Sequence, residues 1–280
     1  MGRINMNASP WLPVETDIKS VLEQYAFPLK ALADGTVPAL IFRKAFNPAH
    51  CAGLIDRFYE RGLLYDPLQN GVSNTTRVDI GTSLGRHSRS DPEIFFAHAR
   101  ETRALFETLF DGYTDPVRFI YHTLNALAPG KQVMTARESA DKLYGPAIFR
   151  TYYEGSGHTP HYDSVRKRSR LFNYSVSRFD RQFAAVLCFQ NAIEDDEHGQ
   201  AFFYRRQWSP DIQDELSHFK AYATEQGIER IRIELAPGDF YVFCSETIHE
   251  VPPPRGDQPR IVLAAFFAMS DDDDEIYVWS

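Results

Sequence analysis

The first half of the chain places apolar residues at the spacing of amphipathic helices. Helices are predicted over residues 14–35, from Asn47-Pro48, from Ser90-Asp91-Pro92 and over residues 117–127, with a short apolar strand at 39–42. Pro28 should end or kink the first helix, because proline lacks the N–H donor and clashes with the preceding turn. The apolar stripe of the helix that begins at Ser90 indicates core packing and not a cofactor site.

After residue 145 the pattern changes to short apolar runs separated by turn residues. Strands are predicted at 147–153, 183–190, 201–204, 230–235, 240–244 and 260–268. Several short strands at irregular spacing favour a double-sheet jelly roll, whose mouth can hold a metal. We therefore expect an α+β fold: a double-stranded β-helix (jelly roll) core with N-terminal helices that buttress one face of the sheet.

The chain shows no internal repeat and no flexible linker, so we expect a single domain over residues 1–280. It divides into a mainly helical part at 1–145, a jelly-roll core at 146–270 and an acidic C-terminal tail at 271–280. A separate N-terminal domain is the alternative. The acid run Asp271-Asp272-Asp273-Asp274-Glu275 is expected to be solvated and without chemistry.

Composition and charge limit the kinds of function. Aromatic residues make up 14% of the chain, which favours a strand-rich interior. The net charge of −8 argues against nucleic acid as a partner, because phosphate binding needs a basic surface. Three scattered cysteines indicate reduced thiols and neither a disulfide framework nor a zinc set. No stretch has the apolar length of a signal peptide or a membrane span, so we expect a cytoplasmic protein.

One short stretch carries metal chemistry. His161 and Asp163 lie two residues apart, so on a strand their side chains point to the same face. A second imidazole from the distant His249 completes a two-histidine, one-carboxylate face, which holds Fe(II) and leaves coordination positions open. With 9 His and 38 acidic residues, about one His-x-acid match is expected by chance, so the motif alone does not decide the matter.

The residues around this motif carry a family resemblance. They are Tyr152, Gly155 and Pro160-His161-x-Asp163 in the first half, and Pro237-Gly238-Asp239, Phe243, His249-Glu250-Val251-Pro252, Gly256 and Arg260 in the second. Their order and spacing resemble the prolyl-4-hydroxylase-type 2-oxoglutarate/Fe(II)-dependent dioxygenases, roughly over residues 148–268. The N-terminal helices and the region from Arg150 to Asp163 are also faintly similar to those of free-standing small-molecule halogenases and hydroxylases.

The resemblance implies a set of site residues. His161, Asp163 and His249 would hold Fe(II). Arg260, eleven positions after His249, would bind the distal carboxylate of the co-substrate 2-oxoglutarate through its planar guanidinium. Tyr152 stands where members of this family often offer a hydroxyl to 2-oxoglutarate, although a buried structural tyrosine fits the position equally well. With O2, such a site hydroxylates an unactivated C–H bond while 2-oxoglutarate is decarboxylated to succinate.

Asp163 bears on the type of reaction. Relatives that halogenate carbon carry Gly or Ala at the carboxylate position, so that a halide can reach the iron. The presence of Asp163 therefore favours hydroxylation, or desaturation or ring closure, of a small molecule of specialised metabolism. Two alternatives stay open: a protein or peptide side-chain hydroxylase, and a metal-binding jelly-roll module or zinc enzyme that does not use 2-oxoglutarate. Arg260 argues against the second alternative, because a non-oxidative metal site needs no buried guanidinium.

Residues 165–182 form a basic segment in an otherwise acidic chain, with six Lys or Arg against the single acid Asp180. The segment is either a lid that closes over an anionic or aromatic substrate or a solvated loop. His158 is expected to face away from His161, because their odd spacing places them on opposite faces of a strand, and Glu250 is expected to face away from the site. Nothing in the sequence indicates the oligomeric state.

Overall fold

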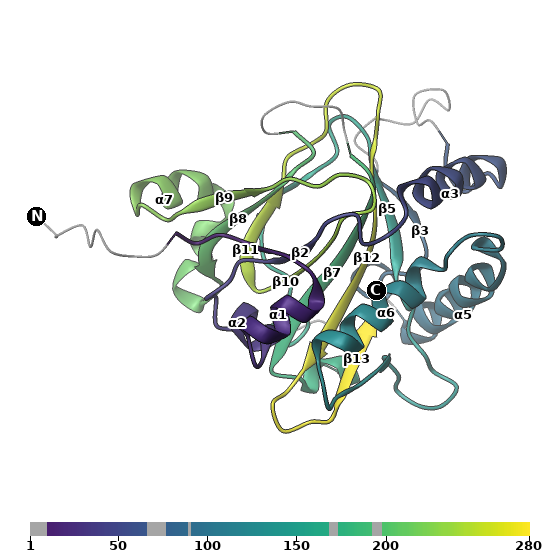
Figure 1. The fold of residues 1–280 in the computed structure, drawn as a ribbon, viewed down its shortest axis with the longest axis horizontal. Coiled ribbons are helices and arrows are strands. Elements are labelled where there is room, and N and C mark those ends of the chain that lie inside the picture. Colours follow the sequence, from purple (N-terminus) through teal and green to yellow (C-terminus); the bar gives the residue numbers. More distant parts are fainter. Residues whose placement is uncertain (1–9, 66–76, 89–90, 168–172, 192–197) are drawn as a thin grey trace, which may run out of the picture.

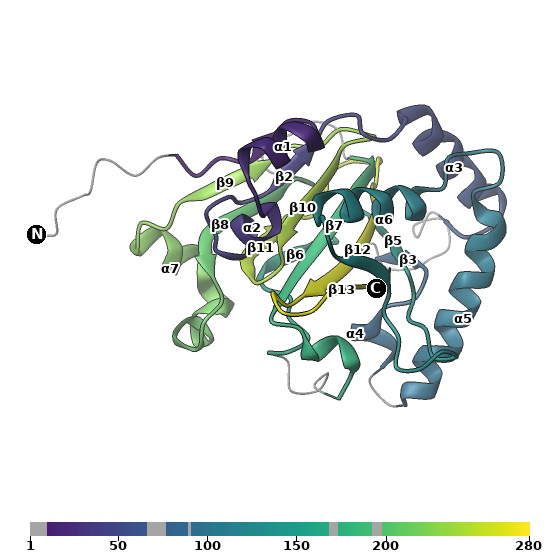
Figure 2. The same ribbon diagram turned by 60° about the horizontal axis from the view of Figure 1, so that its bottom comes forward.

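The computed structural model describes residues 10–65, 77–88, 91–167, 173–191 and 198–280. Two β-sheets face each other in these residues, and the N-terminal helices cover the outer face of the larger sheet (Figure 1 and Figure 2). The arrangement is α+β, as the order of the predicted elements indicates.

The helices are α1 (Ile18–Gln24), α2 (Pro28–Ala33), α3 (Pro48–Glu60), α4 (Leu84–His87), α5 (Pro92–Leu109), α6 (Pro116–Leu127) and α7 (Phe219–Glu225), with short 3-10 turns at Ser175–Arg178, Pro210–Ile212 and Asp214–His218. The strands are β1 (Val14–Glu15), β2 (Leu40–Phe42), β3 (Val78–Ile80), β4 (Gln132–Thr135), β5 (Ile148–Tyr152), β6 (His158–His161), β7 (Arg181–Gln190), β8 (Ala201–Gln207), β9 (Arg230–Ile233), β10 (Phe240–Cys244), β11 (Thr247–Val251), β12 (Arg260–Met269) and β13 (Glu275–Trp279).

Among the described residues, the larger sheet has nine strands. Its main order is β1-β2-β10-β7-β12-β13-β4, and β5 pairs with both β12 and β3 beside this path. The smaller sheet has the order β6-β11-β8-β9. The strands predicted from the apolar runs are therefore divided between two facing sheets.

Three helices begin in the same way, with an acceptor side chain followed by proline. Asn47, Asp91 and Asp115 each accept a hydrogen bond from a backbone N–H two residues ahead, at the start of α3, α5 and α6. Such a cap satisfies a donor that the helix itself leaves open, and proline at the first position loses nothing. Pro28 acts in the same position of α2, so the apolar pattern over 14–35 becomes two short helices and not one.

Alternate residues of the central strands β7 and β12 point to opposite faces of the larger sheet, one toward the helices and the other toward the smaller sheet. Phe183, Leu187 and Leu263 pack into the core shared with the helices. Ala184 and Val186 face the smaller sheet. Because these inward-facing side chains are small, space remains between the two sheets for a cavity.

The last residues differ from the expected acidic tail. Glu275–Trp279 forms β13, which pairs antiparallel with β12 and parallel with β4. Tyr277 and Trp279 are buried, and Asp273 and Glu275 both form ion pairs with Arg178. The acid run is therefore partly neutralised, and the four apolar residues after it fill a strand between β12 and β4.

All three cysteines are buried and free of disulfide bonds, as their scattered positions predict. Burial raises the pKa of Cys51 and Cys188 to about 12 and that of Cys244 to about 11. No helix in the described part of the chain is both long and apolar enough to cross a membrane.

Candidate active site

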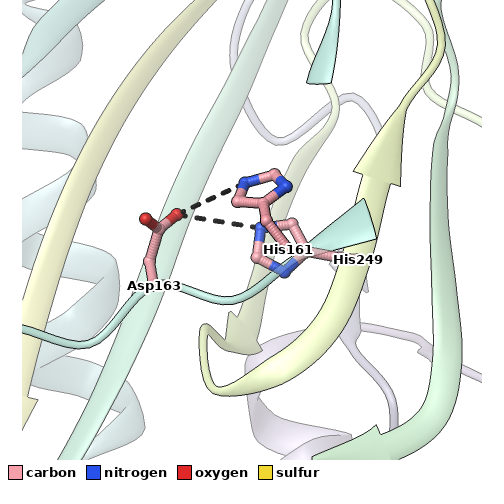
Figure 3. Close-up of side chains that lie close together, drawn as sticks. All are labelled: His161, Asp163 and His249. Carbon is pink, nitrogen blue, oxygen red and sulfur yellow. Dashed lines mark ion pairs between the residues drawn. The ribbon is translucent and has the colours of Figure 1, made fainter. Parts of the chain in front are cut away.

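Three segments bring His161, Asp163 and His249 together between the sheets (Figure 3). His161 ends β6 and lies opposite His249 of β11 in the antiparallel ladder. Asp163 follows two residues after β6, where its N–H donates to the carbonyl of Ser245 and its own carbonyl accepts from the Ser245 hydroxyl. The turn between β10 and β11 therefore fixes the carboxylate beside both imidazoles.

The donor atoms are arranged as a metal site requires. Asp163 Oδ2 lies 3.6 Å from His161 Nε2 and 3.8 Å from His249 Nε2, and the three ligand atoms lie within 4.8 Å of one another. Each imidazole Nδ1 lies 2.8 Å from the carbonyl oxygen two residues before it, of Thr159 or Thr247. A carbonyl only accepts, so each Nδ1 carries the proton and each Nε2 presents its lone pair to the site.

A cavity of about 670 Å³ opens beside these three residues, and all three line it. Its walls come from both sheets and from α4. Phe203 and Phe243 contact the ring of His249 edge-on, with centroids 6.0 and 5.0 Å away, so the inner side of the site is apolar. The volume lies in the range usual for small-molecule sites.

Arg260 fits the role of a co-substrate anchor. It is the first residue of β12, only 3% exposed, and it lines the cavity. No acidic side chain of the described residues forms an ion pair with it, and its guanidinium carbon lies 5.5 Å from the ring of Tyr152. A buried cation without a carboxylate is costly, so the position suits a ligand that brings one. A carboxylate of the co-substrate would meet this need.

Tyr152 and Tyr241 border the same end of the cavity. Burial raises the pKa of Tyr241 to about 12, so its hydroxyl keeps its proton. The hydroxyl of Tyr152 lies 3.2 Å from Nε2 of His158. The structure thus gives Tyr152 a protein partner as well as a position in the cavity wall.

The expectation that His158 faces away from His161 is wrong. His158 lines the cavity, and its ring centroid lies 5.1 Å from that of His161. In the ladder His249 pairs with His161 and Val251 with His158, so two steps on β11 match three on β6. This bulge adds one residue to β6, so His158 and His161 lie on the same face although they are three residues apart. Burial, with a contribution from His161, lowers the pKa of His158 to about 3.

Glu250 faces away from the site, as predicted. Its side chain is 1% exposed and accepts hydrogen bonds from the Tyr204 hydroxyl at 2.8 Å and from Arg230 at 2.9 Å. Lys220 pairs with the other carboxylate oxygen at 2.7 Å. This buried ion cluster supports β11 from behind His249.

The basic segment 165–182 is held by ion pairs where the structure describes it. Arg166 pairs with Asp180, Lys167 pairs with Glu246, and Arg178 pairs with the acids near β13. Residues 168–172 of this segment lie outside the described residues. Three of the four described cations therefore have acidic partners within the protein, which favours the loop interpretation over a lid for this part.

Sequence reasoning missed three arginines that line the cavity: Arg77, Arg86 and Arg150. Arg150 lies two residues before Tyr152 on β5, so the alternation of a strand could have placed it on the same face. Arg77 directly precedes β3 and Arg86 lies within α4, and no apolar run predicts either element.

The family model of the carrier-protein-independent halogenase WelO5 matches residues 11–280. The chain belongs to this family. No curated protein sequence matches it. The faint similarity to free-standing halogenases is thereby confirmed, together with membership of the 2-oxoglutarate/Fe(II)-dependent dioxygenase superfamily.

Solved structures share the fold at low sequence identity. An N-substituted L-amino acid dioxygenase from Burkholderia ambifaria AMMD has a TM-score of 0.58 and 16% identity, with 90% of each chain covered. Its complex with alpha-ketoglutarate has a TM-score of 0.56 and 17% identity, also with 90% of each chain covered. The epimerase SnoN, in complex with Fe3+, alpha-ketoglutarate and nogalamycin RO, has a TM-score of 0.50 and 15% identity, with 90% of this chain and 84% of that chain covered.

Membership of the family and the His161, Asp163 and His249 cluster identify the cofactors. The WelO5 family member described here is a 2-oxoglutarate/Fe(II)-dependent oxygenase, and it uses Fe(II), 2-oxoglutarate and O2. The alternative of a zinc enzyme or a jelly-roll binding module is therefore set aside.

Proposed function

We propose that this WelO5 family member hydroxylates a C–H bond of a small molecule and does not halogenate it. The observation that carries this proposal is the Asp163 carboxylate, whose Oδ2 lies 3.6 and 3.8 Å from the two imidazole Nε2 atoms. A carboxylate there supplies the third protein ligand and fills the position that a halide needs. The family is named for halogenation, but halogenating relatives carry Gly or Ala at this position.

The residues of the site divide between metal and co-substrate. In this proposal His161, Asp163 and His249 hold Fe(II), and the Nδ1 hydrogen bonds of the two histidines keep their Nε2 atoms directed at the metal. Arg260 binds the distal carboxylate of 2-oxoglutarate, and Tyr152 borders that end of the cavity. The core is a jelly roll buttressed by N-terminal helices, and the chain acts as one dioxygenase domain.

When bound, Fe(II), 2-oxoglutarate and O2 supply the oxidising power that replaces a C–H hydrogen with oxygen, and 2-oxoglutarate leaves as succinate and CO2. The protein positions the reactants and keeps water away. Phe203 and Phe243 form an apolar wall against His249, and the small side chains of Ala184 and Val186 leave room for substrate above the sheet. A cavity walled by both sheets favours a small molecule over a protein or peptide side chain.

Chloride sensitivity tests the proposal. In the wild type, chloride should change neither the visible charge-transfer band of the anaerobic Fe(II) and 2-oxoglutarate complex nor the affinity for 2-oxoglutarate, because Asp163 occupies the position. Asp163→Gly should acquire chloride dependence and lose hydroxylation. With a turned-over substrate and labelled O2, the product should gain an oxygen atom from O2 even in chloride buffer.

Two results would contradict this proposal. One is a wild-type band or affinity that shifts with chloride, or a chlorinated product, either of which would indicate halogenation. The other is full hydroxylation by Asp163→Gly, which would remove Asp163 from the metal site.

A further inference from the structure

The cavity is positively charged in a protein whose net charge is −8. Apart from histidines, its charged lining side chains are four arginines and one acid: Arg77, Arg86, Arg150, Arg260 and Asp163. One further acid lies close by. Asp79 accepts from Arg77 at 2.7 Å and lies 3.5 Å from Arg86.

The cofactors do not remove this excess. The two positive charges of Fe(II) and the two negative charges of 2-oxoglutarate cancel, and Asp163 and Asp79 offset two of the four arginines. Two arginine charges remain around the part of the cavity that is left for substrate. A low-dielectric cleft lined by one sign of charge attracts a ligand of the opposite sign.

Arg150 and the triad line the same cavity. His249 contacts Phe243 with ring centroids 5.0 Å apart, and strand register aligns Phe243 with Ala184 and Ala184 with Phe266. The guanidinium carbon of Arg150 lies 5.9 Å from the ring centroid of Phe266. Phe243, Ala184 and Phe266 thus lie side by side on neighbouring strands of the larger sheet, with His249 near the first and the Arg150 cation near the last.

Arg260 occupies a different end of the cavity. In the ladder Arg260 pairs with Tyr152 and Val262 pairs with Arg150, so the two arginines begin one inward-facing position apart, about 7 Å along the strand. The guanidinium of Arg260 lies by the ring of Tyr152, whereas that of Arg150 lies by the ring of Phe266. A co-substrate that chelates iron with one carboxylate and binds Arg260 with the other leaves Arg150 for a different anion.

Arg150 has no anionic partner in the described part of the chain. No acidic side chain of the described residues forms an ion pair with it, and its Nε is buried without a hydrogen-bond acceptor among them. Arg77 differs from Arg150 in this respect, because its guanidinium donates two hydrogen bonds of 2.7 Å to the carboxylate of Asp79.

The cavity that Arg150 lines has apolar walls as well. Leu84 of α4, Ile148 of β5, Val165, Phe266 of β12 and Trp279 of β13 line it, and Phe266 lies close to both Arg150 and Trp279. A ligand that binds Arg150 and fills this space has a largely apolar body. The planar fork of arginine matches a carboxylate with two parallel hydrogen bonds.

We propose that the substrate is a small, largely apolar molecule that carries a carboxylate, and that Arg150 binds this carboxylate. Arg86, whose side chain is 59% exposed, adds positive charge at the mouth of the cavity. This inference rests on the proposed oxygenase site and names the substrate class of that site.

The test compares acids with their uncharged amides. Hydrocinnamate, indolepropionate and octanoate, each beside its primary amide, are titrated by calorimetry into anaerobic protein that holds Fe(II) and saturating 2-oxoglutarate. At least one acid should bind the wild type roughly 10- to 100-fold more tightly than its amide, which is the size of a hydrogen bond to a charged group.

Variants of Arg150 test whether this residue causes the preference for acids over amides. Arg150→Gln should abolish it and leave the affinity for 2-oxoglutarate within about threefold of the wild type. Arg150→Lys keeps the charge without the fork and should retain part of it. Arg118→Gln, at an exposed position of α6, is the matched control and should bind as the wild type does. If Arg150→Gln does not fold, the proposal is still tested by Arg150→Lys and by the comparison of acids with amides in the wild type.

Two outcomes overturn the proposal while the oxygenase site stands. One is a wild type in which no acid binds more tightly than its amide. The other is an Arg150→Gln variant that loses affinity for 2-oxoglutarate and keeps the preference for acids, which would assign Arg150 to the co-substrate. A wild type that binds iron but not 2-oxoglutarate would instead overturn the proposed function, on which this inference rests.

Discussion

Replacing Arg260 by methionine should affect the stability of the protein differently in the absence and in the presence of 2-oxoglutarate. Met keeps much of the apolar stem and removes the charge. Arg260 is 3% exposed and forms no ion pair with the described acids, so its removal breaks no internal salt bridge. We therefore expect the protein without 2-oxoglutarate to be as stable as the wild type or more stable, because an uncompensated buried cation is lost.

The effect should appear when 2-oxoglutarate is added. Loss of one partner of a buried, hydrogen-bonded charge pair costs about 3 kcal/mol, which weakens binding about 150-fold. At a 2-oxoglutarate concentration of about 100 times the wild-type Kd, the wild type should gain about 2.7 kcal/mol in free energy of unfolding. The variant should gain only about 0.3 kcal/mol under the same conditions.

Urea denaturation of the metal-loaded protein, with and without 2-oxoglutarate, measures both quantities. Arg118→Met at an exposed position of α6 is the control and should behave as the wild type does. Arg260→Lys should lie between the wild type and Arg260→Met, because it keeps the charge and loses the planar fork. Equal stabilisation of Arg260→Met and wild type by 2-oxoglutarate would refute the assignment of Arg260 as the anchor.

Three further predictions follow from other contacts. Glu250→Gln should lower the free energy of unfolding by about 2 kcal/mol in urea, because it leaves the half-buried Arg230 without its carboxylate; a loss below about 0.5 kcal/mol would contradict this. Because burial raises the pKa of the three thiols to about 11 or 12, they should resist a thiol reagent at pH 8 until the protein unfolds. The unfolded chain loses these protons at lower pH than the folded one, so stability should fall as pH rises from about 9 toward 12. Lys167→Met removes the 2.6 Å hydrogen bond to Glu246, whose carboxylate also accepts a hydrogen bond from Ser164, the residue after Asp163. This change should weaken iron binding about tenfold, and an unchanged Kd for iron would contradict the prediction.

The sequence predicted the elements whose signals are local. Asn47-Pro48 and Ser90-Asp91-Pro92 marked the starts of α3 and α5, and apolar spacing marked α6 to within one residue. Continuous apolar runs marked β7, β10 and β12. The proximity of His161, Asp163 and His249 also followed from a local motif together with a family pattern. In each case, short-range spacing carries most of the information.

The features that were missed depend on long-range pairing. β13 follows an acid run that looks solvated, and only Arg178 and the neighbouring strands explain why it is buried. His158 was placed on the wrong face because one bulge in β6 changes the alternation, and a bulge is set by the partner strand. Strand alternation places Arg150 on the same face of β5 as Tyr152, but the facing sheet is needed to show that this face lines a cavity.

The central claim is that His161, Asp163 and His249 hold an iron that 2-oxoglutarate chelates. The most direct measurement is an anaerobic titration of the Fe(II)-loaded protein with 2-oxoglutarate, followed by the weak visible charge-transfer band of the chelate. The account predicts a band that saturates at one 2-oxoglutarate per iron and that is lost in His249→Ala. Iron bound to the wild type without any such band would contradict it.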